Sequence, residues 1–141
     1  MLEHGISSQV WSVTSYIELA RELRDIDRQN LLNLEEDHLV SYVGECLEGD
    51  RPVIAASDYV KAVPEQLRSA IQAPYHVLGT DGFGRSDTRE KLRQFFEVNH
   101  QFIAYTALVK LYEIGVCEKK VLSDFKKEFD IDSDKPNPRL A

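Results

Sequence analysis

The residues best placed to bind a ligand are seven consecutive ones in a glycine-rich segment: Asp81, Gly82, Phe83, Gly84, Arg85, Ser86 and Asp87. The segment directly follows a short apolar run that is typical of a buried strand. In open α/β sheets, ligands bind beyond the carboxyl ends of the strands, and free N–H groups at a helix start attract anions. Arg85, Ser86 and the backbone around Gly82 and Gly84 could therefore hold a carboxylate or a phosphate.

The glycine spacing of this segment, however, matches neither common phosphate-binding motif. From Gly79 onward the order is G-x-x-G-x-G, and no Gly-Lys-Ser or Gly-Lys-Thr follows. Asp81 and Asp87 would also repel an anion. We therefore interpret the segment as a tight turn in which glycines supply positive φ and Asp87 caps the next helix. The alternative is a stand-alone small α/β module that binds an anionic metabolite at residues 81–88.

Other residue types that could perform chemistry are scattered along the chain. The four histidines lack a convincing second ligand at metal-binding spacing: His4, His38, His76 and His100. Glu35 and Glu36, which precede His38, are more typical of the acidic first turn of a helix. Cys46 falls on an apolar helix face, and Cys117, near a helix start, has no obvious partner. We predict no catalytic, cofactor-binding or metal-binding residues in this chain.

Three apolar segments are typical of short strands: residues 10–14, 52–56 and 75–79. The first runs into Ser15 and Glu18, a capping box in which each side chain satisfies a free backbone N–H. Strands that alternate with helices predict a layered α/β/α fold around a small, mainly parallel sheet. Three strands are few for the number of helices, which indicates that a strand is missing.

Helix signals occur along the rest of the chain. Asn33 followed by Glu36 predicts a second helix, and Asp87 followed by Glu90 predicts one that reaches about residue 97. We also expect a helix over residues 64–71, with Pro64 in its first position, and another over residues 99–114. A last helix should place Val121, Leu122, Phe125 and Phe129 inward. Residues 134–141 should form a polar tail on the surface.

The composition is that of one globular domain spanning residues 1–141, with 43% hydrophobic and 29% charged residues. Twenty-four acidic residues against 17 basic ones give a net charge of −7, which argues against binding to nucleic acid or anionic lipid. Apolar runs are too short to cross a membrane, and the first residues show no secretory signal. Two cysteines do not make a disulfide framework, so we expect a cytoplasmic protein.

Four segments, in order along the chain, together resemble a known family. The most distinctive is Leu78–Glu90, LGTDGFGRSDTRE, and the others are Ser12–Ser15 with Glu18–Arg21, Ala56–Tyr59 and Asn137–Ala141. This set is similar to the C-terminal domain of the homodimeric, bacterial-type pyruvate dehydrogenase component of the pyruvate dehydrogenase complex, a member of the transketolase superfamily. The resemblance covers essentially the whole chain, and the long loop motif is specific to this family.

The resemblance implies a parent enzyme that uses thiamine diphosphate and magnesium. Such an enzyme decarboxylates pyruvate and then reductively acetylates the lipoyl group of dihydrolipoyl acetyltransferase. In this family the cofactor chemistry belongs to two preceding domains, and Thr80-Asp81-Gly82 is not the diphosphate–magnesium motif. No residue here corresponds to the glutamate that activates the cofactor, so the isolated chain is expected to be inactive.

The resemblance also implies that the family's domain begins one strand and one helix earlier. We therefore expect this chain to be a fragment of a larger one, with Leu2 and Ile6 ending a truncated apolar face. Its role would be structural: to pack against the preceding catalytic domains and the second subunit of a homodimer. The loop over residues 81–87 would face those neighbours.

Overall fold

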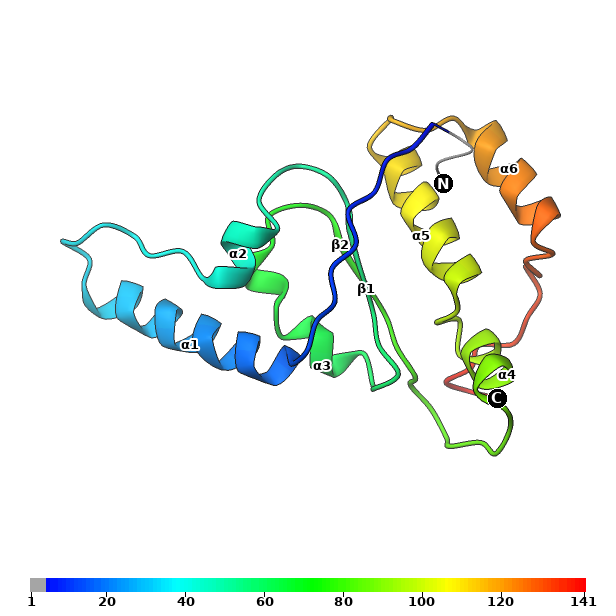
Figure 1. Ribbon diagram of the computed structural model, residues 1–141, viewed down its shortest axis with the longest axis horizontal. Coiled ribbons are helices and arrows are strands. Elements are labelled where there is room, and N and C mark those ends of the chain that lie inside the picture. Colours follow the sequence, from blue (N-terminus) through cyan, green and yellow to red (C-terminus); the bar gives the residue numbers. More distant parts are fainter. Residues whose placement is uncertain (1–4) are drawn as a thin grey trace.

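Helices lie on both sides of a pair of short strands in the computed structural model, which describes residues 5–141 (Figure 1). Leu2 and His4 fall outside these residues. The elements follow the chain in the order α1 (Tyr16–Leu32), α2 (Tyr42–Cys46), β1 (Val53–Ala56), α3 (Ala62–Glu65), the 3₁₀ helix η2 (Arg68–Ala70), β2 (Tyr75–Leu78), α4 (Arg89–Phe95), α5 (His100–Glu113) and α6 (Lys119–Glu128).

Strands β1 and β2 form a two-stranded parallel sheet, the one sheet in the described part of the chain. Val53 pairs with Tyr75, and Ala55 pairs with Val77. Because side chains alternate along a strand, these four residues share one face of the sheet. Both strands coincide with sequence predictions to within one residue, and their helical crossover confirms the α/β class.

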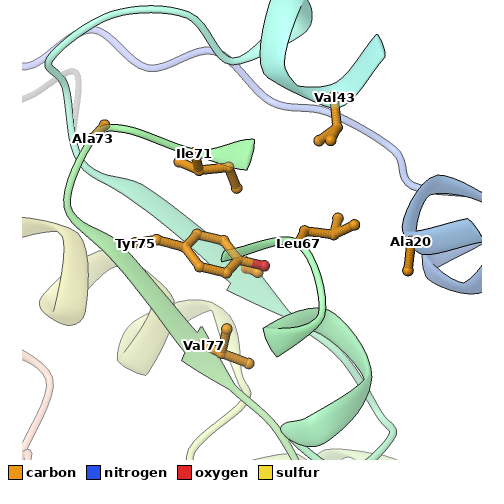
Figure 2. Close-up of a cluster of buried hydrophobic side chains, with 8 residues drawn as sticks. Ala20, Val43, Leu67, Ile71, Ala73, Tyr75 and Val77 are labelled. Atoms are coloured by element: carbon orange, nitrogen blue, oxygen red, sulfur yellow. The ribbon is translucent and has the colours of Figure 1, made fainter. Parts of the chain in front are cut away.

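One face of the sheet packs on α1 and α2 through a buried apolar cluster (Figure 2). The hydroxyl of Tyr75 donates a hydrogen bond to the carbonyl oxygen of Pro64, at 2.9 Å. Burial raises the pKa of this hydroxyl, which stays protonated and partnered inside the core. The buried members of the cluster are Ala20, Val43, Ala55, Leu67, Ile71, Ala73, Tyr75 and Val77.

Helices α5 and α6 supply the second layer, since α5 contacts β1 and α6 packs on α5. Leu108 of α5 is completely buried, and Phe125 of α6 is 3% exposed. The rings of Tyr105 and Phe125 stack with their centroids 6.2 Å apart. Burial, and then the charge of Lys110, lower the pKa of His76 in β2. None of the described helices is both long and apolar enough to span a membrane.

Residues 10–14 do not form the expected third strand. The segment is not hydrogen-bonded into the sheet, and the side chains of Val10 and Trp11 are 90% and 47% exposed. A strand needs a neighbouring strand to satisfy its backbone groups, and alternation of side chains does not supply one. The prediction of a third strand was therefore wrong.

A loop replaces the helix expected from Asn33. This residue ends α1 instead, since its backbone and side-chain N–H groups donate to the carbonyl oxygen of Gln29, at 3.0 and 2.9 Å. The short helix α2 begins later, with Ser41 as its N-cap. Between the two helices, the Asn30 side chain makes two hydrogen bonds of 2.9 Å to the backbone of Leu39, one as donor and one as acceptor. These bonds close the loop at its base.

Two short turns, α3 and η2, replace the single helix expected over residues 64–71. Pro64 occupies the third position of α3 rather than the first, which a proline in the first helical turn tolerates. Arg68 of η2 donates to both carboxylate oxygens of Glu65, at 2.7 and 2.8 Å, and to the carbonyl oxygen of Tyr75, at 3.0 Å. The side chain of Arg68 therefore ties these turns to β2.

Ser15 caps α1, as the sequence predicted, by accepting the backbone N–H of Glu18 at 3.2 Å, whereas the Glu18 carboxylate pairs with Arg21 at 2.9 Å instead of completing the capping box. We expect Ser15→Ala to lower the free energy of unfolding by about 1 kcal/mol, because one N–H of the first turn loses its partner. Urea denaturation of the two proteins measures the difference. Ser12→Ala, in the exposed segment before the helix, should change stability by less than about 0.5 kcal/mol. Equal losses in the two variants would contradict the capping role.

Candidate functional site

The loop over residues 81–87 lies at the carboxyl end of β2, beside the turn that follows β1. The backbone N–H of Thr80 donates to the carbonyl oxygen of Tyr59 at 3.0 Å. The Thr80 hydroxyl donates to the backbone carbonyl oxygen of Asp58 at 2.8 Å. The carboxylate of Asp81 accepts the backbone N–H of Lys61 at 2.9 Å. Asp81 therefore braces the loop against the neighbouring turn.

Two glycines allow the close approach of other backbone segments at this edge. A Cβ on Gly79 would lie 2.8 Å from the carbonyl oxygen of Tyr59. Gly82 has φ +114°, and a Cβ there would lie 2.8 Å from the carbonyl oxygen of Pro138. The expectation that glycines supply positive φ is therefore met by Gly82, whereas Gly84 has open space around it and no positive φ.

Thr88, and not Asp87, is the N-cap of α4. The Thr88 hydroxyl accepts the backbone N–H of Lys91 at 3.4 Å, and the Asp87 carboxylate accepts the N–H of Thr88 at 2.7 Å. The predicted cap was one residue early, because both side chains can accept a backbone N–H and the capping-box spacing alone does not distinguish them. Helix α4 ends at Phe95, before Glu97, which has φ +62°.

An ion pair that the sequence did not predict joins the turn after β1 to α4. The guanidinium of Arg93 donates to both carboxylate oxygens of Asp58, at 3.0 and 2.6 Å. These hydrogen bonds hold the pKa of the Asp58 carboxyl below its ordinary value. The two residues are 35 positions apart and belong to no local motif, so only the fold brings them together.

Removal of the guanidinium should return the pKa of Asp58 towards its ordinary value. We expect this return of the Asp58 pKa in Arg93→Met. Arg85→Met, which removes another cation that lines the same groove, should leave the Asp58 pKa depressed. Because the folded-state pKa is lowered, the pair stabilises the fold above the unfolded pKa of about 3.9 and loses this effect as the pH falls through the folded value. Carbon-detected NMR titration of the Asp58 carboxyl measures its pKa. The same pKa in both variants would contradict the pairing of Asp58 with Arg93. The side chains are 58% and 44% exposed, so solvent screening keeps the stabilisation small.

An open groove of about 470 Å³ lies between the loop and α4. Phe83 stands at its rim with 82% of its side chain exposed. The guanidinium of Arg85 lies over the ring of Phe95, 4.0 Å from its centroid. Arg85, Ser86 and Asp87 also line a smaller hollow of about 230 Å³. The groove itself is lined by Asp58, Thr80, Gly82, Phe83, Gly84, Arg85, Asp87, Arg89, Leu92, Arg93 and Phe96.

The C-terminal tail contacts the end of α4 through Lys135. Nζ of Lys135 donates to the carbonyl oxygen of Phe95 at 2.6 Å and to the carboxylate of Glu97 at 3.0 Å. The side chain of Lys135 is 20% exposed, and its ammonium lies 5.4 Å from the centroid of the Phe95 ring. Figure 1 shows the chain end beside α4. The tail, the loop and α4 therefore form one connected unit.

The histidines and cysteines of the described residues do not gather at this site. His38 pairs with the side chain of Asn30, with 3.5 Å between the two nitrogens. The Cys117 sulfur lies 3.6 Å from the carbonyl oxygen of Glu118, and burial raises the pKa of its thiol. Within residues 5–141, no three histidine, cysteine or acidic side chains form a group that could hold a metal ion.

The family model of the transketolase-like C-terminal domain matches residues 1–99. This match covers most of the chain, so the chain belongs to the transketolase-like C-terminal domain family. The α/β architecture agrees with that assignment.

Curated relatives narrow the similarity to one kind of protein, the pyruvate dehydrogenase E1 component. The proteins of that name from Escherichia coli K12 and Pseudomonas aeruginosa are each 46% identical to this chain, over 140 and 138 residues. The protein from Cupriavidus necator is 46% identical over 135 residues. These alignments cover 99%, 96% and 95% of this chain but 16%, 16% and 15% of the relatives. The chain therefore spans about a sixth of their length.

Proposed function

We propose that this chain is the C-terminal domain of a pyruvate dehydrogenase E1 component, a thiamine-diphosphate-dependent, acetyl-transferring enzyme. The observation that carries the proposal is identity of 46% along 99% of the chain to proteins of that name. The parent enzyme would decarboxylate pyruvate and reductively acetylate the lipoyl group of dihydrolipoyl acetyltransferase, its partner in the complex. We also propose that it is cytoplasmic and a homodimer.

The chemistry of this enzyme would reside in the remainder of the protein. The described residues offer no cluster of ligands suited to magnesium. The Asp81 carboxylate, next to Gly82, already accepts the N–H of Lys61. We propose that thiamine diphosphate and magnesium bind elsewhere in the parent enzyme, and that the task of this domain is structural: to pack against the catalytic domains and to support assembly of the dimer.

The loop over residues 81–87 is our candidate for a contact with those neighbours. The hydrogen bonds of Thr80 and Asp81 to the adjacent turn hold the start of the loop, two residues before the exposed Phe83. Residues that already have a fixed conformation lose little entropy when they bind. Arg85, stacked on Phe95, is preorganised in the same way.

The mass of the native protein tests the proposal. An antibody against this chain should detect in the source cells a band several times heavier than 16.1 kDa. The band should co-fractionate with pyruvate-dependent decarboxylase activity. A band at 16.1 kDa, separate from that activity, would overturn the proposal and would favour a stand-alone module that binds an anionic metabolite at residues 81–88.

A further inference from the structure

The ammonium group of Lys135 is largely enclosed, although the residue belongs to a polar tail. Its Nζ lies 2.6 Å from the carbonyl oxygen of Phe95 and 3.0 Å from the carboxylate of Glu97, and the side chain is 20% exposed. The centroids of the Phe95 and Phe102 rings are 5.4 and 5.6 Å away. A carboxylate and the faces of aromatic rings both attract a positive charge. An uncharged side chain of similar size would lose the ion pair and the attraction to both rings.

The end of α4 depends in turn on this contact. Glu97 has φ +62°, in the left-handed region that favours glycine. A residue other than glycine stays in that region where surrounding contacts hold it, and the ion pair with Lys135 is one such contact. The carbonyl group of Phe95 belongs to the last turn of the helix, where carbonyl groups need partners from outside it. Lys135 therefore stabilises the point at which α4 ends.

The Phe95 ring links the tail to the loop over residues 81–87 through side-chain contacts. The guanidinium of Arg85 lies 4.0 Å from the ring centroid, so the ring attracts one cation from the loop and another from the tail. The tail also approaches the loop directly, since a Cβ on Gly82 would lie 2.8 Å from the carbonyl oxygen of Pro138. Figure 1 shows the chain end, in red, returning from α6 to α4. A displacement of the tail should therefore reach the loop.

We propose that Lys135 is a charge-operated latch, and that acylation of its amine releases the tail and the loop together. While the charge is present, the ammonium holds the tail on α4 and supports the Phe95 ring against Arg85. Once the amine is acylated, the resulting amide can neither pair with Glu97 as an ion nor act as a cation on the rings. This makes Lys135 a modification site, and its reagent is an acyl thioester.

The reaction is an acyl transfer that needs no other reagent. The Lys135 nitrogen attacks the carbonyl carbon of the thioester, and a C–N bond forms as the C–S bond breaks. The sulfur leaves as a thiol with one proton of the ammonium, and a second proton passes to solvent. Only an unprotonated nitrogen can attack, so the ammonium that is bonded to Glu97 is unreactive and acylation takes place when the tail has opened. The modification then prevents the latch from closing.

Substitution in the full-length protein that contains this chain tests the latch. Lys135→Gln removes the charge as acetylation does, Lys135→Arg keeps it, and Lys127→Gln removes the charge of an exposed lysine in the last turn of α6. The readout is the rate of tryptic cleavage after Arg85 in the loop and after Arg139 in the tail. Trypsin does not cut before proline, and Pro136 follows Lys135, so substitution of this lysine leaves the set of tryptic sites unchanged.

We expect Lys135→Gln to raise both cleavage rates at least about fivefold and Lys127→Gln to change them by less than about twofold, because proteolysis reports the population of the open form. Lys135→Arg should retain most of the protection. Faster cleavage after Arg139 alone would overturn the coupling of the tail to the loop. An increase in Lys135→Arg as large as in Lys135→Gln would show that charge does not operate the latch, and unchanged rates in Lys135→Gln would overturn the latch itself.

Acylation of the native protein gives a second readout. With acetyl-coenzyme A as the thioester, we expect Lys135 to be acetylated at least about tenfold more slowly than Lys127, and the two to react at similar rates in urea. Gly82→Ala, which should displace the tail, should raise the rate at Lys135 and leave that at Lys127 unchanged. Equal rates at the two lysines of the native protein would contradict an enclosed amine. These readouts require no enzymatic activity, so their failure is distinct from a failure of the proposed function.

Discussion

Leu108→Ala should lower the free energy of unfolding by about 3 kcal/mol. Leu108 is completely buried where α5 packs beside the sheet. Truncation removes apolar surface from the core and leaves a cavity that the neighbouring side chains fill only in part. This expected loss is a large fraction of the 5–15 kcal/mol that stabilises a typical domain.

Chemical denaturation measures the loss at Leu108, and Leu31→Ala provides the control. Leu31 also lies in a helix but is 72% exposed, so its truncation should change stability by less than about 0.5 kcal/mol. Leu108→Met, which nearly conserves volume, should lose less than about 1.5 kcal/mol. A Leu108→Ala protein as stable as the Leu31→Ala protein would show that the two helical layers are not packed as described.

Gly82→Ala should destabilise the loop and displace the tail. The backbone φ of +114° at Gly82 disfavours any side chain, and the added Cβ would approach the carbonyl oxygen of Pro138 to 2.8 Å. We expect a loss of about 2 kcal/mol, from the strain of a residue held in a sparsely populated backbone conformation. Faster tryptic cleavage after Arg139 would report displacement of the tail.

Gly84→Ala is the matched control for this change. Gly84 lies two residues away, has no positive φ and has open space around its Cα. Its substitution should be neutral or slightly stabilising, since alanine reduces the conformational freedom of the unfolded chain. Similar cleavage rates for the two variants would mean that the tail does not depend on the glycine at position 82.

Local sequence signals predicted the parts of the fold that depend on local physics. Both strands of the sheet are continuous apolar runs, and the predicted cap at Ser15 is a side chain that satisfies a nearby N–H group. Helix α5 occupies the predicted region, although most of its side chains are half-buried and Leu108 alone of its described residues is fully buried. The resemblance supplied the family, which the comparisons confirmed.

Errors arose where a local signal is compatible with more than one structure. Residues 10–14 have strand-like alternation but no strand beside them to bond with. Asn33 has the side chain of an N-cap, yet the end of α1 uses it as a C-cap. Propensity does not choose between these roles, because Asn can bond to N–H groups at a helix start or to carbonyl groups at a helix end.

The candidate site was predicted only in part, because several of its contacts join residues that are far apart in the sequence. The loop over residues 81–87 stands out in the sequence, and the structure places it at the edge of the sheet. Its bonds to Lys61 and Tyr59 and its contact with Pro138 depend on tertiary structure. The Asp58–Arg93 pair is invisible to local spacing, as is the lysine in the tail that binds the end of α4.

The Asn30 bonds to Leu39 also make the loop between α1 and α2 a place where foreign sequence can be inserted. They fix the two ends of the loop whatever lies between them. The entropy of closing a flexible loop grows only logarithmically, at about 0.6 kcal/mol for each doubling of length. Residues 34–37 are all exposed, so an affinity tag or a fluorophore-binding peptide placed there would leave the groove untouched. The domain therefore carries its own attachment point for a reporter.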